Sequence, residues 1–335
     1  MFKRIIISLS AMLMCGSAAF AQDKDTESKH VVVAYVTSWS RVMPNPFVMT
    51  HINYAFGHVN DTFDGVKIDN PERLKELLRL RRVNPDLKIM LSVGGWGSGR
   101  FSEMAADENL RMSFAKDCLR VVEEFPLDGI DIDWEYPGSS DAGISSSPED
   151  WENFTLLMRD LRAVLGTDRL LTVASSAYAE YIDFASCMQY LDFVNVMTYD
   201  MANAPYHHCA LYESEIADKS SDGAVKAHIN AGVPASQLVL GVPFYGRGGT
   251  AFPRFVDYND IKADDEFVEM WDETAQAPYL ADKDGVLVLG YDNPKSLEIK
   301  CRYIKENGLL GGMYWEYSGD KENGELQKVL AHELL

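Results

Sequence analysis

The chain has 335 residues, of which 47% are hydrophobic and 24% charged, a balance that excludes disordered, collagen-like and low-complexity proteins. Its 31 basic and 51 acidic side chains give a formal net charge of −20, which would repel a nucleic-acid backbone or an anionic membrane surface. We therefore expect no nucleic-acid partner. The length fits one barrel-sized domain or two ordinary domains.

Residues 1–21 are predicted to be a secretory signal peptide. Lys3-Arg4 precedes an apolar run over residues 5–14, and Ala19-Phe20-Ala21 supplies a cleavage site of the small-x-small type. The run is too short to span a membrane, and no later stretch approaches the ~20 apolar residues of a membrane helix. We expect a secreted or periplasmic protein without stable membrane insertion.

Four cysteines follow the predicted signal peptide, at wide and irregular spacings that do not suggest a zinc or thiol redox site. Export would permit disulfides in three full pairings, but a core of this size needs no cross-links, so we expect buried free thiols. The fifth, Cys15, could carry a lipid anchor, although bulky Met14 stands where a lipoprotein signal needs a small residue. The four are Cys118, Cys187, Cys209 and Cys301.

Apolar, β-rich segments alternate with helical segments along the rest of the chain. This alternation indicates a parallel sheet, and eight strand–helix units predict a (β/α)8 TIM barrel, whose chemistry lies at the C-terminal ends of its strands. The predicted strands are residues 31–37, 52–56, 88–92, 129–134, 170–174, 193–197, 238–244 and 310–315.

The helices between these strands carry recognisable start and stop signals. Asn70-Pro71 and Asn293-Pro294 each place a capping side chain before a proline at the first helical position. Residues 147–150, Ser-Pro-Glu-Asp, form a predicted capping box ahead of another helix. Gly308 is predicted to end the helix that starts after Asn293.

About fifty residues separate the seventh predicted strand from the last main helix, too many for an ordinary connection. We predict a small α+β insertion there, over about residues 247–290, beside the mouth of the barrel. No linker or repeat supports a second independent domain, so residues 22–335 are expected to form one catalytic barrel.

The run DGIDIDWEYP, residues 128–137, is the strongest chemical signal in the chain. Side chains alternate along a strand, so Asp131, Asp133 and Glu135 share one face and the apolar residues between them share the other. Because helices cover the outside of a barrel, the acids must point inward, where carboxylates are costly to bury. They cannot all ionise cheaply, so we expect at least one raised pKa, and Glu135 at the mouth is the best placed general acid.

Metal binding is the main alternative for this acidic cluster. A calcium helix–loop–helix site counted from Asp131 would need glycine where Tyr136 stands, so that version fails, whereas magnesium at the strand end stays open. His207 and His208 are adjacent and adjacent histidines rarely ligate one ion, so we expect them to have a loop role. Our interpretation uses no metal and no other cofactor.

The acidic run closely resembles the D-G-x-D-x-D-x-E signature of glycoside hydrolase family 18, the chitinase family. The resemblance extends over nearly the whole chain after the signal peptide. Many members carry an α+β insertion domain where this chain has its short insertion, so the depth of the substrate groove is open. The other similar motifs are AYVTSW (34–39), YAF (54–56), SVGGW (92–96), MTYD (197–200), GVPFYGR (241–247), YD (291–292) and GGMYW (311–315).

Several of these motifs place aromatic residues at predicted strand ends, which favours a platform for stacking sugars over core packing. This reading is preferred for Trp315, and both readings stay open for Tyr35 and Phe56. Gly94 and Gly95 are expected to let the chain turn tightly beside the fourth strand. The predicted substrate-binding residues are Tyr35, Phe56, Trp96, Met197, Asp200, Tyr245, Arg247 and Trp315.

The resemblance implies a retaining mechanism in which no enzyme carboxylate attacks the sugar. Glu135 protonates the glycosidic oxygen, and the acetamido oxygen of the substrate itself attacks the anomeric carbon. Asp133 orients the acetamido group, Tyr199 hydrogen-bonds it and Asp131 tunes Asp133. The family departs from the two-carboxylate scheme, so acid spacing does not predict stereochemistry here.

We therefore expect a monomeric, endo-acting chitinase that hydrolyses β-1,4-linked N-acetylglucosamine polymers or oligosaccharides. An endo-β-N-acetylglucosaminidase acting on N-glycans shares the signature, although WEYP (134–137) and GVPFYGR favour chitin. A non-catalytic, lectin-like chitin-binding barrel is the alternative of another class. Such barrels usually lack the acid at the position of Glu135, which is present here.

Overall fold

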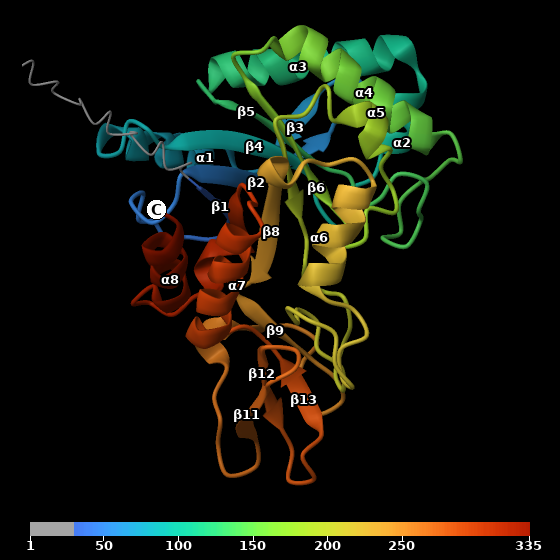
Figure 1. The fold of residues 1–335 in the computed structure, drawn as a ribbon. Helices are drawn as coiled ribbons and strands as arrows, with labels where there is room; N and C mark the ends of the chain where they lie inside the picture. Colours follow the sequence, from blue (N-terminus) through green and yellow to red (C-terminus); the bar gives the residue numbers. More distant parts are fainter. Residues whose placement is uncertain (1–29) are drawn as a thin grey trace, which may run out of the picture.

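The computed structural model describes residues 30–335, and the predicted signal peptide lies outside them. Eight parallel strands form a closed barrel, because β1 pairs with both β2 and β14 (Figure 1). The predicted (β/α)8 TIM barrel is confirmed. In order around the barrel, the strands are β1 (Val31–Thr37), β2 (His51–Val59), β4 (Lys88–Gly94), β5 (Gly129–Asp133), β6 (Leu170–Ser175), β7 (Phe193–Val196), β8 (Leu238–Pro243) and β14 (Gly311–Trp315).

Helices follow every barrel strand except β1. The β1–β2 connection, residues 38–50, is irregular and contains Pro44 and Pro46, which would each remove a helical hydrogen bond. A short strand, β3 (Val66–Ile68), pairs antiparallel with β2. The helices are α1 (Pro71–Leu78), α2 (Phe101–Ala106), α3 (Glu108–Glu124), α4 (Asp150–Leu165), α5 (Phe184–Cys187), α6 (Ser221–Asn230), α7 (Pro294–Glu306) and α8 (Glu325–Leu334), with 3₁₀ turns at Arg79–Arg82, Ala235–Gln237, Tyr258–Asp260 and Tyr317–Gly319.

The predicted helix caps are correct at α1 and α7 and only partly correct at α4. The Asn293 side chain accepts the Ser296 N–H, and the Ser296 hydroxyl accepts the Asn293 N–H, which makes a capping box. The α4 helix instead begins at Asp150, whose carboxylate accepts the Ser147 N–H at 2.8 Å. The Ser147 hydroxyl accepts the Glu149 N–H instead of the Asp150 N–H, so only one half of the predicted capping box is formed.

The side chains of β5 alternate between the barrel interior and the surrounding helices, as predicted. Ile130 and Ile132 belong to the apolar layer between the strands and the helices, and Trp134 stacks on Phe101 of α2 with ring centroids 5.2 Å apart. Next to this strand, Gly94 has φ 133°, and a Cβ there would lie 1.9 Å from the Asp133 carbonyl oxygen. Glycine is therefore required at the end of β4.

The insertion is a five-stranded antiparallel sheet in the order β10-β9-β13-β12-β11. Figure 1 shows it, in orange, extending from the barrel on the side away from α3 and α4. Because β9 starts just after β8, it brings its side chains to the mouth of the barrel. The strands are β9 (Tyr245–Gly248), β10 (Val256–Asp257), β11 (Val268–Asp272), β12 (Ala277–Ala281) and β13 (Leu287–Gly290).

Two further features bear on the sequence-based expectations. All four cysteines of residues 30–335 are buried and unpaired, so the expected free thiols are confirmed. Across the same residues, no helix combines the length and the apolar character needed to cross a membrane.

Candidate active site

A cavity of about 730 Å³ lies at the C-terminal ends of the barrel strands. The structure brings all the predicted site residues together there, and only Asp131 lies beneath the cavity lining instead of in it. The predicted residues that line the cavity are Tyr35, Phe56, Trp96, Asp133, Glu135, Met197, Tyr199, Asp200, Tyr245, Arg247 and Trp315.

Asp131 is fully buried inside the barrel and accepts hydrogen bonds from four other strands. Its Oδ2 accepts the Tyr35 hydroxyl of β1 at 2.8 Å and the Ser92 hydroxyl of β4 at 2.7 Å. Its Oδ1 accepts the Thr172 hydroxyl of β6 at 2.6 Å and the Asn195 amide of β7 at 3.2 Å. Ser92 and Thr172 lie directly beside Asp131 in the strand register, so all three point inward. Burial raises the pKa of Asp131, and the four donors oppose that rise.

Asp133 comes next along the same inward face and is buried in the cavity wall. Its Oδ1 has no hydrogen-bond partner within residues 30–335. Burial raises the pKa of Asp133 well above its usual range, and the charges of Glu135 and Asp131 add to the rise. A buried acceptor without a partner is costly, so this oxygen is suited to receive a donor from a bound ligand.

Glu135 follows the end of β5 and is half-buried in the same wall. Burial raises its pKa to about 7, and the negative charge of Asp200 contributes to the rise. The carboxyl group therefore carries a proton in a substantial fraction of molecules near neutral pH. A group with this pKa at a cavity wall can act as a general acid.

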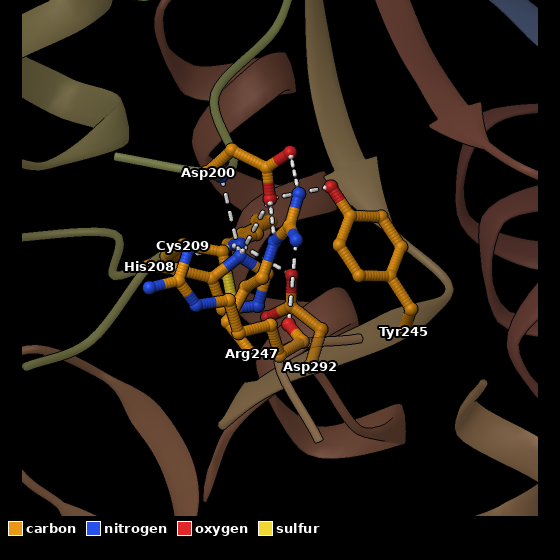
Figure 2. A network of polar contacts seen from close by, with 8 residues as sticks. Asp200, His208, Cys209, Tyr245, Arg247 and Asp292 are labelled. Carbon is orange, nitrogen blue, oxygen red and sulfur yellow. Dashed lines mark hydrogen bonds and ion pairs between the residues drawn. The ribbon is translucent and has the colours of Figure 1, made fainter. Parts of the chain in front are cut away.

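Tyr199 and Asp200 follow β7 and line the same cavity. The Tyr199 hydroxyl contacts the Met313 Sδ at 3.6 Å, and a thioether is a weak acceptor, so a ligand oxygen can replace it. Asp200 accepts the Tyr245 hydroxyl at 2.8 Å and two N–H groups of Arg247 at 2.5 Å (Figure 2). Burial alone would raise the pKa of Asp200, but Arg247 and His208 hold it below its usual range. Asp200 is therefore ionised where Glu135 is partly protonated.

Aromatic rings form much of the remaining surface. Trp315, at the end of β14, lies nearly parallel to Phe56, with ring centroids 5.5 Å apart and an interplanar angle of 19°. Trp96 is 63% exposed at the rim, which a core role does not explain. Tyr35 is buried, contacts Trp315 and lines the cavity, so it serves the core and the site together. The rings provide flat apolar faces of the kind on which sugars stack.

The cavity also includes residues that the sequence analysis did not predict. Tyr136 directly follows Glu135 and stacks on Tyr181, with ring centroids 4.6 Å apart. Trp39 lies just past the end of β1, within the motif AYVTSW, so its place at the cavity could have been predicted. Ser176 and Ala177 directly follow β6, and Met201 follows Asp200. The remaining residues lie further along loops or on the insertion, where no local pattern places them. The unpredicted lining residues are Trp39, Tyr136, Ser176, Ala177, Tyr178, Glu180, Tyr181, Met201, Lys219 and Phe255.

The acidic and histidine residues are not grouped as metal ligands. Within residues 30–335, no group of three or more His, Cys, Asp or Glu side chains is arranged to hold a metal ion. His207 and His208 are buried in the loop between β7 and α6, as expected for a loop role. His208 lies beside Asp200, with its Nδ1 3.6 Å from Oδ1 of that carboxylate.

Comparison with known proteins defines the class to which this barrel and site belong. The model of the glycosyl hydrolases family 18 matches residues 31–320. The chain is 31% identical to chitinase A1 of Niallia circulans over 99% of this chain and 62% of that protein. It is 30% identical to an endochitinase of Manduca sexta over 91% of this chain and 66% of that protein. The chain therefore belongs to glycoside hydrolase family 18, and it spans less than two thirds of the length of these two relatives.

Solved structures agree with this assignment. A family 18 N-acetylglucosaminidase from Paenibacillus barengoltzii is 37% identical, with a TM-score of 0.83 over 91% of this chain and 100% of that one. The Group IV chitinase of Ostrinia furnacalis, solved in complex with allosamidin, is 29% identical, with a TM-score of 0.80 over 91% and 97% of the two chains. Both are similar to this chain over the whole barrel.

The raised pKa of Glu135 predicts a pH-dependent contribution to stability. In the native state this carboxyl keeps its proton up to about pH 7, whereas the unfolded chain releases it near the ordinary glutamate pKa of ~4.3. The contribution is complete below the unfolded pKa and is lost as the pH rises through the native pKa. The melting temperature of the wild type should therefore fall relative to Glu135→Gln between about pH 4 and 7.

Thermal melts of both proteins across this range test the prediction, with Glu180→Gln at the cavity rim as the matched carboxyl control. If the wild-type and Glu135→Gln curves stay parallel across the whole range, Glu135 does not bind a proton in the native state near neutral pH.

Proposed function

We propose that this protein is a retaining glycosidase that hydrolyses β-1,4-linked N-acetylglucosamine polymers or oligosaccharides. The observation that carries the proposal is the unpartnered, buried Oδ1 of Asp133 beside Glu135, whose pKa is about 7, in an aromatic-lined cavity. An acceptor and a proton donor so placed suit a sugar that carries both an amide and a scissile oxygen. Family 18 substrates are glycans that contain N-acetylglucosamine.

In the proposed first step, Glu135 transfers its proton to the glycosidic oxygen. The acetamido oxygen of the substrate attacks the anomeric carbon, so a carbon–oxygen bond to the acetamido group forms as the glycosidic bond breaks. Asp133 accepts the amide N–H, which orients the acetamido group and stabilises it in the attacking position. Tyr199 donates its hydroxyl hydrogen to the reacting acetamido group.

In the second step, the deprotonated Glu135 takes a proton from water, and that water attacks the anomeric carbon. The ring opens to restore the acetamido group, and two displacements at one carbon retain its configuration. Direct attack by Asp133 is disfavoured, because burial and the neighbouring carboxylates raise the pKa of Asp133 and reduce its ionised fraction.

Two other activities could use the same mechanism on different substrates. The 37% identical relative from Paenibacillus barengoltzii is named as an N-acetylglucosaminidase, which favours release of single sugars as a second candidate. Cleavage of the N-glycan core is the third, because it uses the same acetamido group. We favour internal cleavage of chitin chains, in keeping with the chitinases of Niallia circulans and Manduca sexta. Secretion through the predicted signal peptide stays part of the proposal.

A product profile distinguishes these substrates. Wild-type protein incubated with chitohexaose should release chain-shortened chitooligosaccharides, and a high-mannose glycopeptide should stay intact. Glu135→Gln should lose about 10²–10⁴-fold in turnover, because the transferable proton is gone, and should still bind the oligosaccharide. Single N-acetylglucosamine as the sole initial product would favour the second candidate. Glycan release alone, or a Glu135→Gln variant within a few-fold of the wild type, would contradict the proposal.

The identity of the nucleophile gives a separate prediction. If the acetamido group attacks, a fully deacetylated oligomer should not be cleaved, since the nucleophile is missing, and a thiazoline mimic of the cyclised sugar should inhibit. Rates on acetylated and deacetylated oligomers and mass spectrometry of the protein measure both points. A glycosyl adduct on Asp133, or brisk cleavage of the deacetylated oligomer, would overturn the substrate-assisted mechanism.

A further inference from the structure

The loop between β7 and α6 places a buried histidine against a residue of the active site. His208 is fully buried, and its Nδ1 accepts the backbone N–H of Asp200 at 3.2 Å (Figure 2). Asp200 has φ 58°, a left-handed conformation that is uncommon for a residue with a side chain. The backbone N–H of Met201 in turn donates to the His208 carbonyl at 3.1 Å. These two bonds hold the turn that presents the Asp200 carboxylate.

The segment that carries His208 is itself held by a buried ion pair. Lys300 of α7 is fully buried and donates from Nζ to Asp292 at 2.5 Å and to the carbonyl oxygen of Cys209 at 2.7 Å. The Ser296 hydroxyl donates to the other oxygen of Asp292 at 2.7 Å. A buried ion pair repays its desolvation only when its remaining polar groups are satisfied. Here one of those groups is the main chain directly after His208.

We propose that His208 is a positioning residue for Asp200, and that Lys300 of α7 and Asp292, just before α7, hold the segment of His208 in place. The proposal rests on the proposed function, because it assigns a supporting layer to the same active site. The Nδ1 acceptor of His208 fixes the backbone of Asp200, so that the Asp200 carboxylate meets both Arg247 and Tyr245 at the cavity.

Electrostatics give this arrangement a measurable consequence. The charge of Asp200 contributes to the raised pKa of Glu135, after the effect of burial. If Asp200 loses its position, the pKa of Glu135 falls, and the proton needed for catalysis is lost at lower pH. The alkaline limb of the pH–rate profile should therefore move to lower pH. His208 stays neutral in this account, because burial lowers its pKa. The charged and titratable groups around it are Asp200, His207, Cys209, Tyr245, Arg247, Asp292 and Lys300.

Matched variants separate positioning from bulk packing. His208→Leu puts an apolar side chain of similar size in place of the imidazole and so removes the acceptor. His208→Asn keeps an acceptor oxygen near the position of Nδ1. The pH profile of kcat/KM on chitohexaose is measured for both. We expect His208→Leu to lose about tenfold in kcat/KM at pH 7, with an alkaline limb at lower pH, and His208→Asn to stay near the wild type.

A second readout does not depend on hydrolysis. The pH dependence of the melting temperature, taken relative to the same variant carrying Glu135→Gln, reports the native pKa of Glu135 directly. In His208→Leu, the pH range over which this difference in melting temperature changes should be narrower than in the wild type. The measurement would stand even if no tested glycan were cleaved. A failed hydrolysis assay with a narrowed window therefore counts against the proposed function and not against the role of His208.

Other results would overturn the proposal. Wild-type pH profiles and melting windows in His208→Leu would show that Asp200 needs no acceptor from His208. Equal impairment of the Leu and Asn variants would show a purely structural role. If His208→Leu does not fold, His208→Gln replaces it, since its acceptor lies one bond further out. If the pH profile of His208→Asn stays near that of the wild type and His208→Gln is impaired, the positioning role is supported. Equal behaviour of these two variants would contradict it.

Discussion

One buried carboxylate on the barrel axis sets the geometry of the whole site. Asp131 receives hydroxyl and amide donors from strands on both sides of β5 and from across the barrel, so its position is fixed by four other strands. An acid buried this deeply is tolerable only when such donors surround it. Because burying this carboxylate is costly, polar side chains form a layer around it inside the barrel, at positions where apolar residues usually pack.

The acids above this layer differ because their surroundings differ. Asp133 has an unpartnered buried oxygen and Glu135 lies in the cavity wall, and burial raises the pKa of both. Asp200 faces Arg247 and Tyr245 and stays ionised. A protonated acid, an unpaired acceptor and a fixed negative charge therefore meet in one cavity, which is the set of groups that the proposed mechanism uses.

Much of this site could be predicted from the sequence, because strand periodicity is local. The inward direction of the three acids follows from alternation alone, and strand ends place Trp315 at the mouth, whereas Tyr199 was predicted from the resemblance to family 18. The donors to Asp131 were not predicted, although Ser92 and Thr172 are polar residues within otherwise apolar predicted strands and could have been noticed. Tyr181 and Phe255 lie on a loop and on the insertion, and their approach to the cavity depends on tertiary packing that no periodicity encodes.

The helix boundaries show the same limit. The capping box at Asn293 was predictable, because both partners lie within one turn of α7 and compete with few other groups. The box expected at Ser147 forms only in part, since the Ser147 hydroxyl accepts the N–H of Glu149 instead of that of Asp150, although the Asp150 carboxylate does accept the Ser147 N–H.

The most direct test of this account is the unfolding free energy of Asp131→Asn. The amide keeps the shape of the side chain but presents an N–H₂ group where two of the four donors now point. Buried donors left without acceptors cost about 1–3 kcal/mol each, so urea unfolding should show a loss of at least about 2 kcal/mol. A variant that unfolds within about 0.5 kcal/mol of the wild type would contradict the central role of Asp131.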